Sequence, residues 1–587
     1  MAEKLTNEQQ AAVDSRERSL LVSAAAGSGK TKVLVERLFS YVEREGANLD
    51  DFLIITYTRA AASELRGKIA KALTERMERD PGNYHLRQQM LRVYRADIKT
   101  VDAFCTALLR ENCHLLGEDA RGHALRPDFR VLDENEAQVL RERVLARTLD
   151  DFYDCLTTGS TLLADTLGAG RDDSALEDLV LELHAKLQAQ PYEDKWLEAQ
   201  RAFWRAVPDK IENTPYGKIL LNEVRRKARH CKNLLQRAAQ EMCANDALNQ
   251  KYAPAFLDAS YQLEALEGKT AEGWDAARGV TIAFPRLAAV KDSDGGEMKA
   301  RMKSLWDNCK ETVKGFAEIF SASSDEAVED LRTMAPAMLA LIDLTADFSR
   351  RYNEEKRRRN SADFSDQEHE AIRLLIGEDG APTELARIVS ARYREIMVDE
   401  YQDTNEVQNR IFDAISCKGE NLFTVGDVKQ SIYRFRLADP RIFLQHYNTW
   451  PPLEDAEEHD SAKLLLSRNF RSRKEVLDAT NFIFCNILSE EMGELDYGAD
   501  EMLRLGANYV ESSACGAEFH LLDLPTQTGE QRVRASEAEA AFVADYISDM
   551  LTSEFPIQDD KTKELRPVRE EDIVILMRSP STRLLDY

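Results

Sequence analysis

The sequence predicts an α/β fold in which a parallel-sheet domain is interrupted by a large helical insertion. Three observations support this prediction. Over the first 110 residues, short apolar runs of the buried-strand type alternate with helical stretches. From about residue 130 to 390 the apolar spacing is helical, and strand patterns nearly disappear. Strand patterns then return from residue 396 onward, which places the insertion between two halves of one domain.

The predicted strands are short and apolar, as expected for parallel strands that are covered on both faces. In chain order they are Leu20–Ser23, Phe52–Thr56, Ile396–Asp399, Leu422–Val425, Lys463–Ser467, Phe519–Leu522 and Ile573–Met577. Helical spacing is clearest in Glu134–Tyr153 and Ala175–Gln190.

A chain of 587 residues is too long for one hydrophobic core. We expect three parts. The first domain comprises residues 1–115 together with 365–450, and the helical insertion comprises residues 116–364. Residues 451–587 form part of a second α/β domain.

The composition is that of an ordinary globular chain, with 43% hydrophobic residues. No apolar run approaches the roughly 20 residues that cross a bilayer, so we expect no membrane partner. The first residues carry no signal-peptide pattern, and the nine cysteines are scattered without a Cys-x-x-Cys pair. This cysteine usage suits a reducing cytoplasm.

The net charge of −26 argues, by itself, against a nucleic-acid partner. Residues 1–115, however, contain 18 Lys and Arg against 16 Asp and Glu, so the acidic excess lies later in the chain. The whole-chain charge therefore does not exclude a DNA-binding groove. The basic cluster at 350–359 is interpreted as a solvated helix face rather than a nucleic-acid contact. The tryptophans of the insertion are interpreted as core anchors; they are Trp196, Trp204, Trp274 and Trp306.

A run of small residues ending in Gly-Lys-Thr follows the first predicted strand and precedes a helical stretch. The run consists of Ala24, Ala25, Ala26, Gly27, Ser28, Gly29, Lys30 and Thr31. Backbone N–H groups of such a loop, and the positive end of the following helix, cradle a polyphosphate. Lys30 is expected to reach the β- and γ-phosphates, and the Thr31 hydroxyl to bind magnesium. Ala24 stands where a glycine is usual, and it still lets the backbone approach. This context makes a chance Gly-Lys-Thr the weaker interpretation.

Two acids, Asp399 and Glu400, stand at the end of the strand pattern that begins at Ile396. An acid at the carboxyl end of a central strand can anchor Mg²⁺, and an adjacent glutamate can polarise the attacking water. An ordinary acidic turn is the alternative, which the phosphate loop makes the weaker one. The predicted chemistry is hydrolysis of ATP with Mg²⁺, and we expect Lys30 and Glu400 to converge on one nucleotide.

Further motifs follow in a fixed order around these two elements. They are Leu5–Val13, Thr56–Leu65, Thr100–Cys105, Asp399–Thr404, Val425–Arg436, Leu466–Ser472 and Asp572–Arg578. In this order they resemble the motifs of superfamily 1 DNA helicases of the UvrD/RecB type. The resemblance implies a P-loop RecA-like parallel-sheet domain, the helical insertion and an incomplete second RecA-like domain.

The resemblance also implies residue roles in the ATP site. Gln9 matches the glutamine that reads the adenine edge, and Phe470 could stack on adenine. Gln430 would sense the γ-phosphate, and Arg471 would act as an arginine finger.

Other motif residues are expected to contact DNA. They are Tyr57, Thr58, Arg59, Thr100, Asp102, Tyr433, Phe435 and Arg436. The aromatic rings among them suit stacking on unpaired bases without reading sequence. A buried core ring is the alternative for Tyr57 and Phe435.

Within the superfamily the chain is most similar to the AddA family of helicase–nuclease proteins. The triple alanine before Gly27, the long insertion and Asp363–Asp366 carry this likeness. The RecB family and UvrD-type repair helicases are the alternatives. The resemblance implies 3′-to-5′ translocation on single-stranded DNA, unwinding of double-stranded DNA, a role in double-strand break repair and recombination, and a second subunit of the AddB type.

No counterpart of the family's later motifs, or of its nuclease with metal-binding carboxylates, follows Arg578 in this sequence. We therefore expect this chain alone to bind Mg–ATP, to hydrolyse it weakly and to unwind nothing. The exonuclease activity of a longer family member is not assigned to these residues. Two alternatives from other classes remain: a non-motor ATP-dependent switch, and a DNA-binding scaffold without catalysis.

Overall fold

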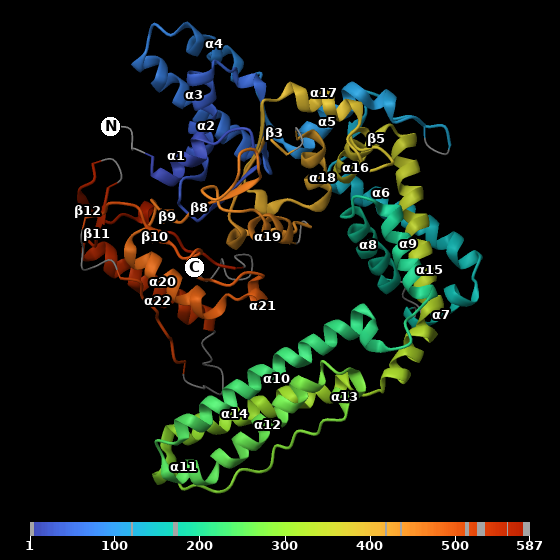
Figure 1. Ribbon diagram of the computed structural model, residues 1–587, viewed down its shortest axis with the longest axis vertical. Helices are drawn as coiled ribbons and strands as arrows, with labels where there is room; N and C mark the ends of the chain where they lie inside the picture. Colours follow the sequence, from blue (N-terminus) through green and yellow to red (C-terminus); the bar gives the residue numbers. More distant parts are fainter. Residues whose placement is uncertain are drawn as a thin grey trace. The chain divides into compact units, whose positions relative to one another are not determined.

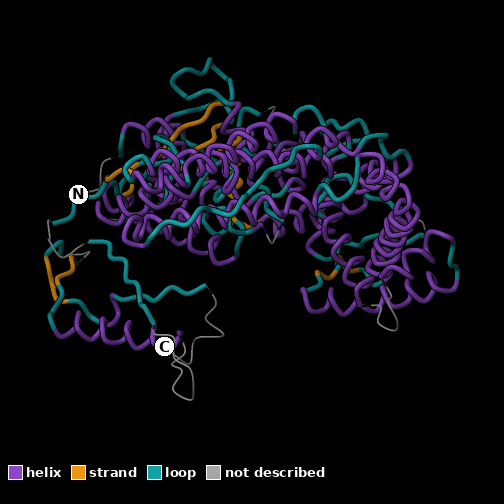
Figure 2. Tube along the Cα trace, turned by 90° about the horizontal axis from the view of Figure 1, so that it is seen from below, coloured by secondary structure: helices purple, strands orange, loops and turns teal. Residues whose placement is uncertain are grey.

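The computed structural model describes residues 5–118, 121–167, 174–416, 419–434, 437–510, 516–524, 535–559 and 562–578. Contacts divide the chain into two compact units. One comprises Met1–Leu132 and Asn360–Tyr587, and the other comprises Asp133–Arg359. Figure 1 follows the elements along the chain, and Figure 2 shows that helix is far more abundant than strand.

A six-stranded parallel sheet forms the centre of the first unit, in the order β3-β2-β6-β7-β1-β8. Its strands are β1 (Leu20–Ala24), β2 (Phe52–Thr56), β3 (Asp97–Thr100), β6 (Glu395–Val398), β7 (Leu422–Gly426) and β8 (Ala462–Leu466). The predicted α/β class with a parallel sheet is confirmed. The sheet joins segments far apart in the sequence, since Val22 pairs with both Val425 and Leu464.

Helices of the first unit surround this sheet or follow it in the chain. They are α1 (Asn7–Asp14), α2 (Lys30–Glu45), α3 (Arg59–Arg79), α4 (Tyr84–Arg92), α5 (Val101–Asn112), α16 (Phe364–Leu375), α17 (Glu384–Arg392), α18 (Glu406–Ile415), α19 (Pro440–Thr449), α20 (Lys474–Ile487), α21 (Glu490–Gly493) and α22 (Ala535–Thr552). Three two-stranded sheets complete the unit: β4 (Arg130–Val131) with β5 (Ser361–Ala362), β9 (Arg468–Asn469) with β10 (Arg504–Leu505), and β11 (Pro556–Gln558) with β12 (Leu565–Pro567).

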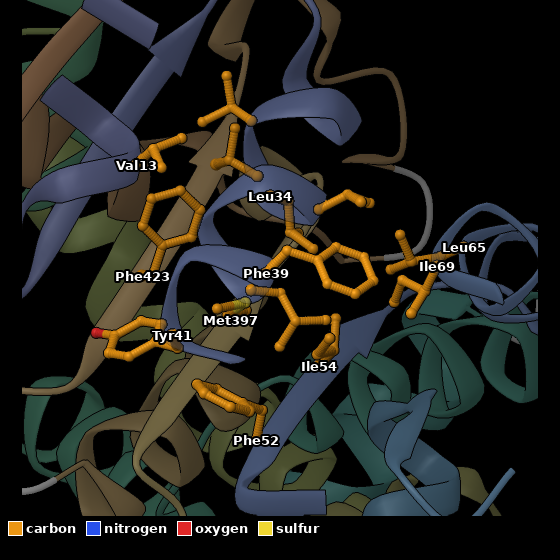
Figure 3. Packing of buried hydrophobic residues seen from close by; sticks show 14 of the residues in the cluster. Val13, Leu34, Phe39, Tyr41, Phe52, Ile54, Leu65, Ile69, Met397 and Phe423 are labelled. Atoms are coloured by element: carbon orange, nitrogen blue, oxygen red, sulfur yellow. The ribbon is translucent and has the colours of Figure 1, made fainter. Parts of the chain in front are cut away.

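The core of the first unit lies between α2, α3 and the sheet. Apolar side chains from these elements point toward one another in Figure 3, among them Leu34, Phe39, Ile54, Met397 and Phe423. Each of these five side chains is at most 1% exposed. The continuous apolar run of β2 is buried at every position, as expected for a strand covered on both faces.

The second unit contains ten α-helices and no strand among its described residues, 133–167 and 174–359. The helices are α6 (Glu134–Asp154), α7 (Thr158–Leu167), α8 (Ser174–Gln188), α9 (Glu193–Arg205), α10 (Pro215–Met242), α11 (Asp246–Lys251), α12 (Ala253–Lys269), α13 (Trp274–Arg278), α14 (Asp292–Ile319) and α15 (Ser324–Arg358). Trp204, Trp274 and Trp306 are at most 5% exposed, so these three are core anchors as predicted.

The basic cluster at the end of α15 is largely neutralised within its own helix. Arg350 pairs with Asp347 and Glu354, and Arg358 and Arg359 both pair with Glu355. These ion pairs favour the predicted solvated face over a nucleic-acid contact. Lys356 departs from that prediction because it is 1% exposed, with its ammonium 4.1 Å from the centre of the Tyr352 ring.

The end of the chain differs most from the predicted elements. Phe519–Leu522 and Ile573–Met577 are not strands, because no neighbouring strand among the described residues bonds to their backbone. Phe519 and Leu576 are each 89% exposed. The strand at Ala462–Leu466 pairs with β1, although the predicted boundary at 451 assigned it to the second domain. The domain boundaries remain a prediction.

A buried ion pair links α2 to the first residue of β6. Arg37 Nε lies 2.8 Å from Glu395 Oε2, and a second Arg37 nitrogen contacts Oε1. Tyr41 donates to the same carboxylate at 3.1 Å, and Arg37 also donates to the Ala12 carbonyl at 2.5 Å. Both charges are at most 2% exposed. This pair holds the helix that begins at Lys30 against the strand that leads to Glu400.

We expect Arg37→Met to lower the free energy of unfolding by about 3–5 kcal/mol, because it leaves a buried carboxylate without its cation. Chemical denaturation measures this loss. The double variant Arg37→Met with Glu395→Gln should recover much of it, since no buried charge then remains. A double variant that is no more stable than Arg37→Met alone would contradict this explanation.

Candidate functional site

The phosphate loop connects β1 to α2 and contains two glycines in the left-handed region. Gly27 has φ of 68°, and Gly29, the N-cap of α2, has φ of 85°. A Cβ on Gly27 would lie 2.6 Å from Asn469 Nδ2, and one on Gly29 would lie 3.2 Å from Gln9 Nε2. Both positions therefore favour glycine for backbone geometry, and Gly27 also lacks the space for a side chain. The α2 N–H groups at this end face a site suited to an anion.

Lys30, the first residue of α2, contacts the acidic end of β6. Its Nζ lies 2.6 Å from Glu400 Oε2, across 370 positions of sequence. The two residues that were predicted to share one nucleotide therefore lie in direct contact, and their shared nucleotide stays a prediction. Glu400 has a left-handed backbone, with φ of 51° and ψ of 44°, which is uncommon for a residue with a side chain.

Two more acids lie beside this pair. Burial, followed by the Glu400 carboxylate, raises the pKa of Asp399 and of Asp403 to about 6, while Lys30 lowers both. Asp399 Oδ1 accepts a 3.0 Å hydrogen bond from the Glu400 backbone N–H. A divalent cation would hold such carboxylates in their ionised form, because it supplies the missing opposite charge. Among the described residues no group of three or more Asp, Glu, His or Cys side chains is arranged to hold a metal ion by itself, so a cation here would need oxygen ligands from a bound phosphate as well.

Gln402 connects the acids to the next strand. Its Nε2 donates to Glu400 Oε2 at 3.0 Å, and its Oε1 accepts from the Asp427 backbone N–H at 2.9 Å. Asp427 in turn accepts from Gln430 Nε2 at 2.8 Å. Gln402 and Asp427 are at most 2% exposed. A buried polar path thus runs from Glu400 to Gln430, the residue predicted to sense the γ-phosphate.

The segment after β8 lies on the phosphate loop. Asn469 Nδ2 donates to the Ala26 carbonyl at 2.7 Å, and the Phe470 N–H donates to the Gly27 carbonyl at 2.8 Å. A Cβ on Gly27 would lie 3.0 Å from the Cβ of Arg471. The structure therefore brings Arg471 beside the loop, as the arginine-finger hypothesis requires.

A cavity of about 200 Å³ opens next to the loop. Its lining includes Gln9, Ser28, Arg468, Phe470 and Arg504. Gln9 is 3% exposed and donates to the Ser28 carbonyl at 2.9 Å, while its Oε1 accepts from the Thr6 N–H at 3.0 Å. The residues predicted for adenine thus line one cavity, and the Gln9 amide is held in a fixed orientation.

These residues fit a magnesium-bound nucleoside triphosphate. The Ser28 hydroxyl is buried in the loop with no hydrogen-bond partner among the described residues. The two glycines let Asn469, Arg471 and Gln9 pack directly against the loop backbone. Lys30 offers a cation, and Thr31 and Asp399 offer oxygen ligands of the kind that Mg²⁺ prefers.

The predicted DNA contacts begin at the carboxyl end of β2 and continue to the start of α5. Thr58 accepts from the Ala61 N–H at 3.0 Å, and Thr100 accepts from the Ala103 N–H at 3.2 Å, so both hydroxyls cap helices. Tyr57 is half-buried, and its hydroxyl bonds to Thr404, next to the acid cluster. Tyr57 is therefore not a fully buried core ring, and its contact with DNA stays a prediction. It connects the first of these motifs to the ATP site.

The remaining predicted DNA contacts differ in their surroundings. Arg59 is exposed, and Asp102 and Tyr433 are half-buried. Burial raises the pKa of Asp102, whereas Arg59 lowers it. Phe435 and Arg436 lie outside the described residues.

Glu368 of α16 is a buried acid in the same region. Burial, followed by the nearby Asp102 carboxylate, raises its pKa to about 7, while hydrogen bonds from Gln408 and Asn405 and the charge of His369 lower it. Between about pH 4.5 and pH 7, Glu368 therefore keeps its proton in the folded chain but has lost it in the unfolded chain. Stability should fall as the pH rises through this window.

We expect Glu368→Gln to remove this dependence, because an amide does not titrate. At pH 8 the variant should be more stable than the parent by up to about 3 kcal/mol, and at pH 4.5 the two should nearly agree. Thermal unfolding at both pH values measures the difference, with the exposed Glu378→Gln as the control. An equal stability difference at both pH values would show that Glu368 does not cause the pH dependence.

Three buried polar residues of the site were missed from the sequence: Gln402, Asp427 and Asn469. Each lies within one of the helicase-like motifs, and this location was the only feature of the sequence that could have identified them as site residues. Their roles depend on which atom each side chain presents to another segment, and no pattern of residue types encodes that.

Among the described residues, no helix combines the length and apolar character needed to span a bilayer.

Comparison with known proteins is consistent with this geometry. Residues 5–451 match the family described as the UvrD/REP helicase N-terminal domain. The chain is 34% identical over 625 residues to the AddA protein of the ATP-dependent helicase/nuclease of Ruminiclostridium cellulolyticum, covering 98% of this chain and 49% of that protein. It is 35% identical over 590 residues to the protein of the same name from Alkaliphilus oremlandii, and the match covers 98% of this chain and 47% of that protein. The chain spans about half the length of the curated relatives it matches.

Proposed function

Because the chain belongs to the UvrD/REP helicase family, we propose that it is the ATP-driven motor region of a DNA helicase–nuclease that acts in double-strand break repair. The observation that carries the proposal is the 2.6 Å contact between Lys30 and Glu400. It brings the phosphate-loop cation and the candidate general base into one site. We further propose 3′-to-5′ translocation, an AddB-type partner and a cytoplasmic location.

In this mechanism Lys30 and the loop N–H groups bind the phosphates of ATP. Bound Mg²⁺, held by Thr31 and Asp399, would neutralise charge on the phosphate oxygens. Lys30 exchanges its Glu400 partner for phosphate, which leaves the Glu400 carboxylate available to accept a proton from the attacking water. Arg471 stabilises the negative charge that develops on the transferred phosphoryl group.

The path from Glu400 through Gln402 and Asp427 to Gln430 can couple the chemistry to DNA. Gln430 donates to Asp427 in this structure and, in this proposal, would donate to the γ-phosphate when ATP is bound. The Tyr57 hydroxyl contacts Thr404, which follows the acids in the chain. Alternation of Gln430 between its hydrogen bonds with and without the γ-phosphate would change the affinity for single-stranded DNA.

Binding of a labelled oligothymidine to the chain tests the proposal. We expect binding that needs no particular sequence and weakens steeply with salt, because phosphate contacts and stacking supply the affinity. Affinity should also differ between Mg–ATP and Mg–ADP. Mg–ATP binding without any affinity for single-stranded DNA would favour the non-motor switch instead.

A further inference from the structure

Asn469, the last residue of β9, uses both ends of its amide to join two distant segments. Its Nδ2 donates to the Ala26 carbonyl of the phosphate loop at 2.7 Å. Its Oδ1 accepts from the backbone N–H groups of Arg471 at 2.8 Å and Ser472 at 2.7 Å. The residue is 3% exposed, so water does not compete for these bonds.

The surrounding backbone fixes the same contact. The Phe470 N–H donates to the Gly27 carbonyl at 2.8 Å. A Cβ on Gly27 would lie 2.6 Å from Asn469 Nδ2, so the amide occupies space that only glycine leaves open. On its other side, the Asn469 carbonyl accepts from the Gly506 N–H at 2.8 Å, which fixes β9 against β10. Asn469 therefore cannot turn its amide without breaking several bonds.

We propose that Asn469 is a positioning residue that couples the phosphate loop to Arg471. This inference rests on the proposed ATP site. Because one rigid amide plane holds the Ala26 carbonyl and the Arg471 N–H, a shift of the loop on nucleotide binding is carried to the arginine. The loop and the arginine segment then respond to the nucleotide as one body.

A simpler role is local capping, since the Oδ1 bonds to Arg471 and Ser472 precede α20. Aspartate accepts such bonds as well as asparagine does. Asn469→Asp therefore keeps the local turn but removes the donor to Ala26 and places a carboxylate against that carbonyl. The new carboxylate also repels the triphosphate, so Asn469→Asp weakens Mg–ATP binding in either role. The two roles differ in the double variant with Arg471→Ala, because coupling predicts losses that do not multiply and capping predicts losses that do.

The first experiment measures Mg–ATP affinity by calorimetry for the parent chain, Asn469→Asp and the control Asn486→Asp. Asn486 is exposed on α20 and bonds within that helix, to the Phe482 carbonyl. We expect at least tenfold weaker binding for Asn469→Asp and parental binding for the control. Equal affinity of Asn469→Asp and the parent would overturn the inference.

A second measurement separates coupling from independent effects. Arg471→Ala should weaken Mg–ATP binding less in the Asn469→Asp background than in the parent, because the arginine is already displaced. Multiplicative losses would show that the two residues act independently and would overturn the coupling.

Hydrogen exchange, measured without nucleotide, tests whether Asn469 holds the Phe470 segment against the phosphate loop. The Phe470 amide, which donates to Gly27, should exchange at least tenfold faster in Asn469→Asp and at the parental rate in Asn486→Asp. Unchanged protection would overturn the inference even if Mg–ATP binds normally. A parent chain with no Mg–ATP affinity would instead overturn the proposed function, while the exchange result would still report on the Asn469 contact.

Discussion

Lys30→Ala should weaken Mg–ATP binding to this chain by about tenfold to a hundredfold. The ammonium of Lys30 provides a charge-assisted hydrogen bond to phosphate, and loss of such a bond costs about 1.5–3 kcal/mol. The substitution also leaves the Glu400 carboxylate, which now lies 2.6 Å from Lys30 Nζ, without its cation beside the triphosphate. Repulsion between the two anions adds to the loss. Isothermal titration of Mg–ATP measures the change.

Lys71→Ala provides the control, because Lys71 is an exposed lysine on α3. It removes the same charge from the surface of the same unit, so it should leave the affinity unchanged. Equal affinities of Lys30→Ala and the parent would favour the scaffold interpretation, in which the loop has no role in nucleotide binding.

Glu400→Gln should separate hydrolysis from binding. A glutamine keeps the shape of the side chain but cannot take a proton from water, so single-turnover hydrolysis of labelled ATP should fall about 10²–10⁴-fold. Mg–ATP should bind as tightly as before or more tightly, because Lys30 no longer has to leave a carboxylate. Quenched-flow measurement with protein in excess gives the rate.

The control for this second substitution is Glu406→Gln, at the start of α18, where the side chain is 51% exposed and pairs with Arg410. It should hydrolyse ATP at the parental rate. If Glu400→Gln also hydrolyses at that rate, another residue activates the water. If it loses Mg–ATP affinity, Glu400 has a binding role that this mechanism does not contain.

The central sheet could be predicted from the sequence because its strands carry their own signal. Phe52–Thr56 was predicted with the observed bounds, and Leu422–Val425 differed only by one residue at its end. Such continuous apolar runs need burial on both faces, and a parallel sheet covered by helices on both sides provides it. The pairing of β8 with β1 was not predictable, since an apolar run indicates a strand but does not determine which sheet the strand joins.

The predicted strands at Phe519–Leu522 and Ile573–Met577 were wrong for a related reason. Their apolar patterns resemble strands, but a strand also needs a neighbour that bonds to its backbone. No described segment supplies one. Local sequence can therefore indicate extended backbone without establishing a sheet.

The charged residues of the site were easier to predict than the amides. A lysine after glycine and an acid pair after a strand have few roles, so Lys30 and Glu400 could be brought together from the sequence. Gln402 and Asn469 act through hydrogen bonds to backbone atoms of other segments, which only the fold reveals. Tyr57 shows a third case, since its hydroxyl meets Thr404, which ends a short turn two motifs further along the chain.

A crystal structure of the chain with Mg²⁺ and a non-hydrolysable ATP analogue would probe the proposed ATP site better than any other experiment. We predict that the triphosphate lies on the Ala24–Thr31 loop, with Lys30 bonded to phosphate and the Glu400 carboxylate facing the terminal phosphate. A nucleotide bound elsewhere, with the Lys30–Glu400 contact intact, would contradict the proposed motor function.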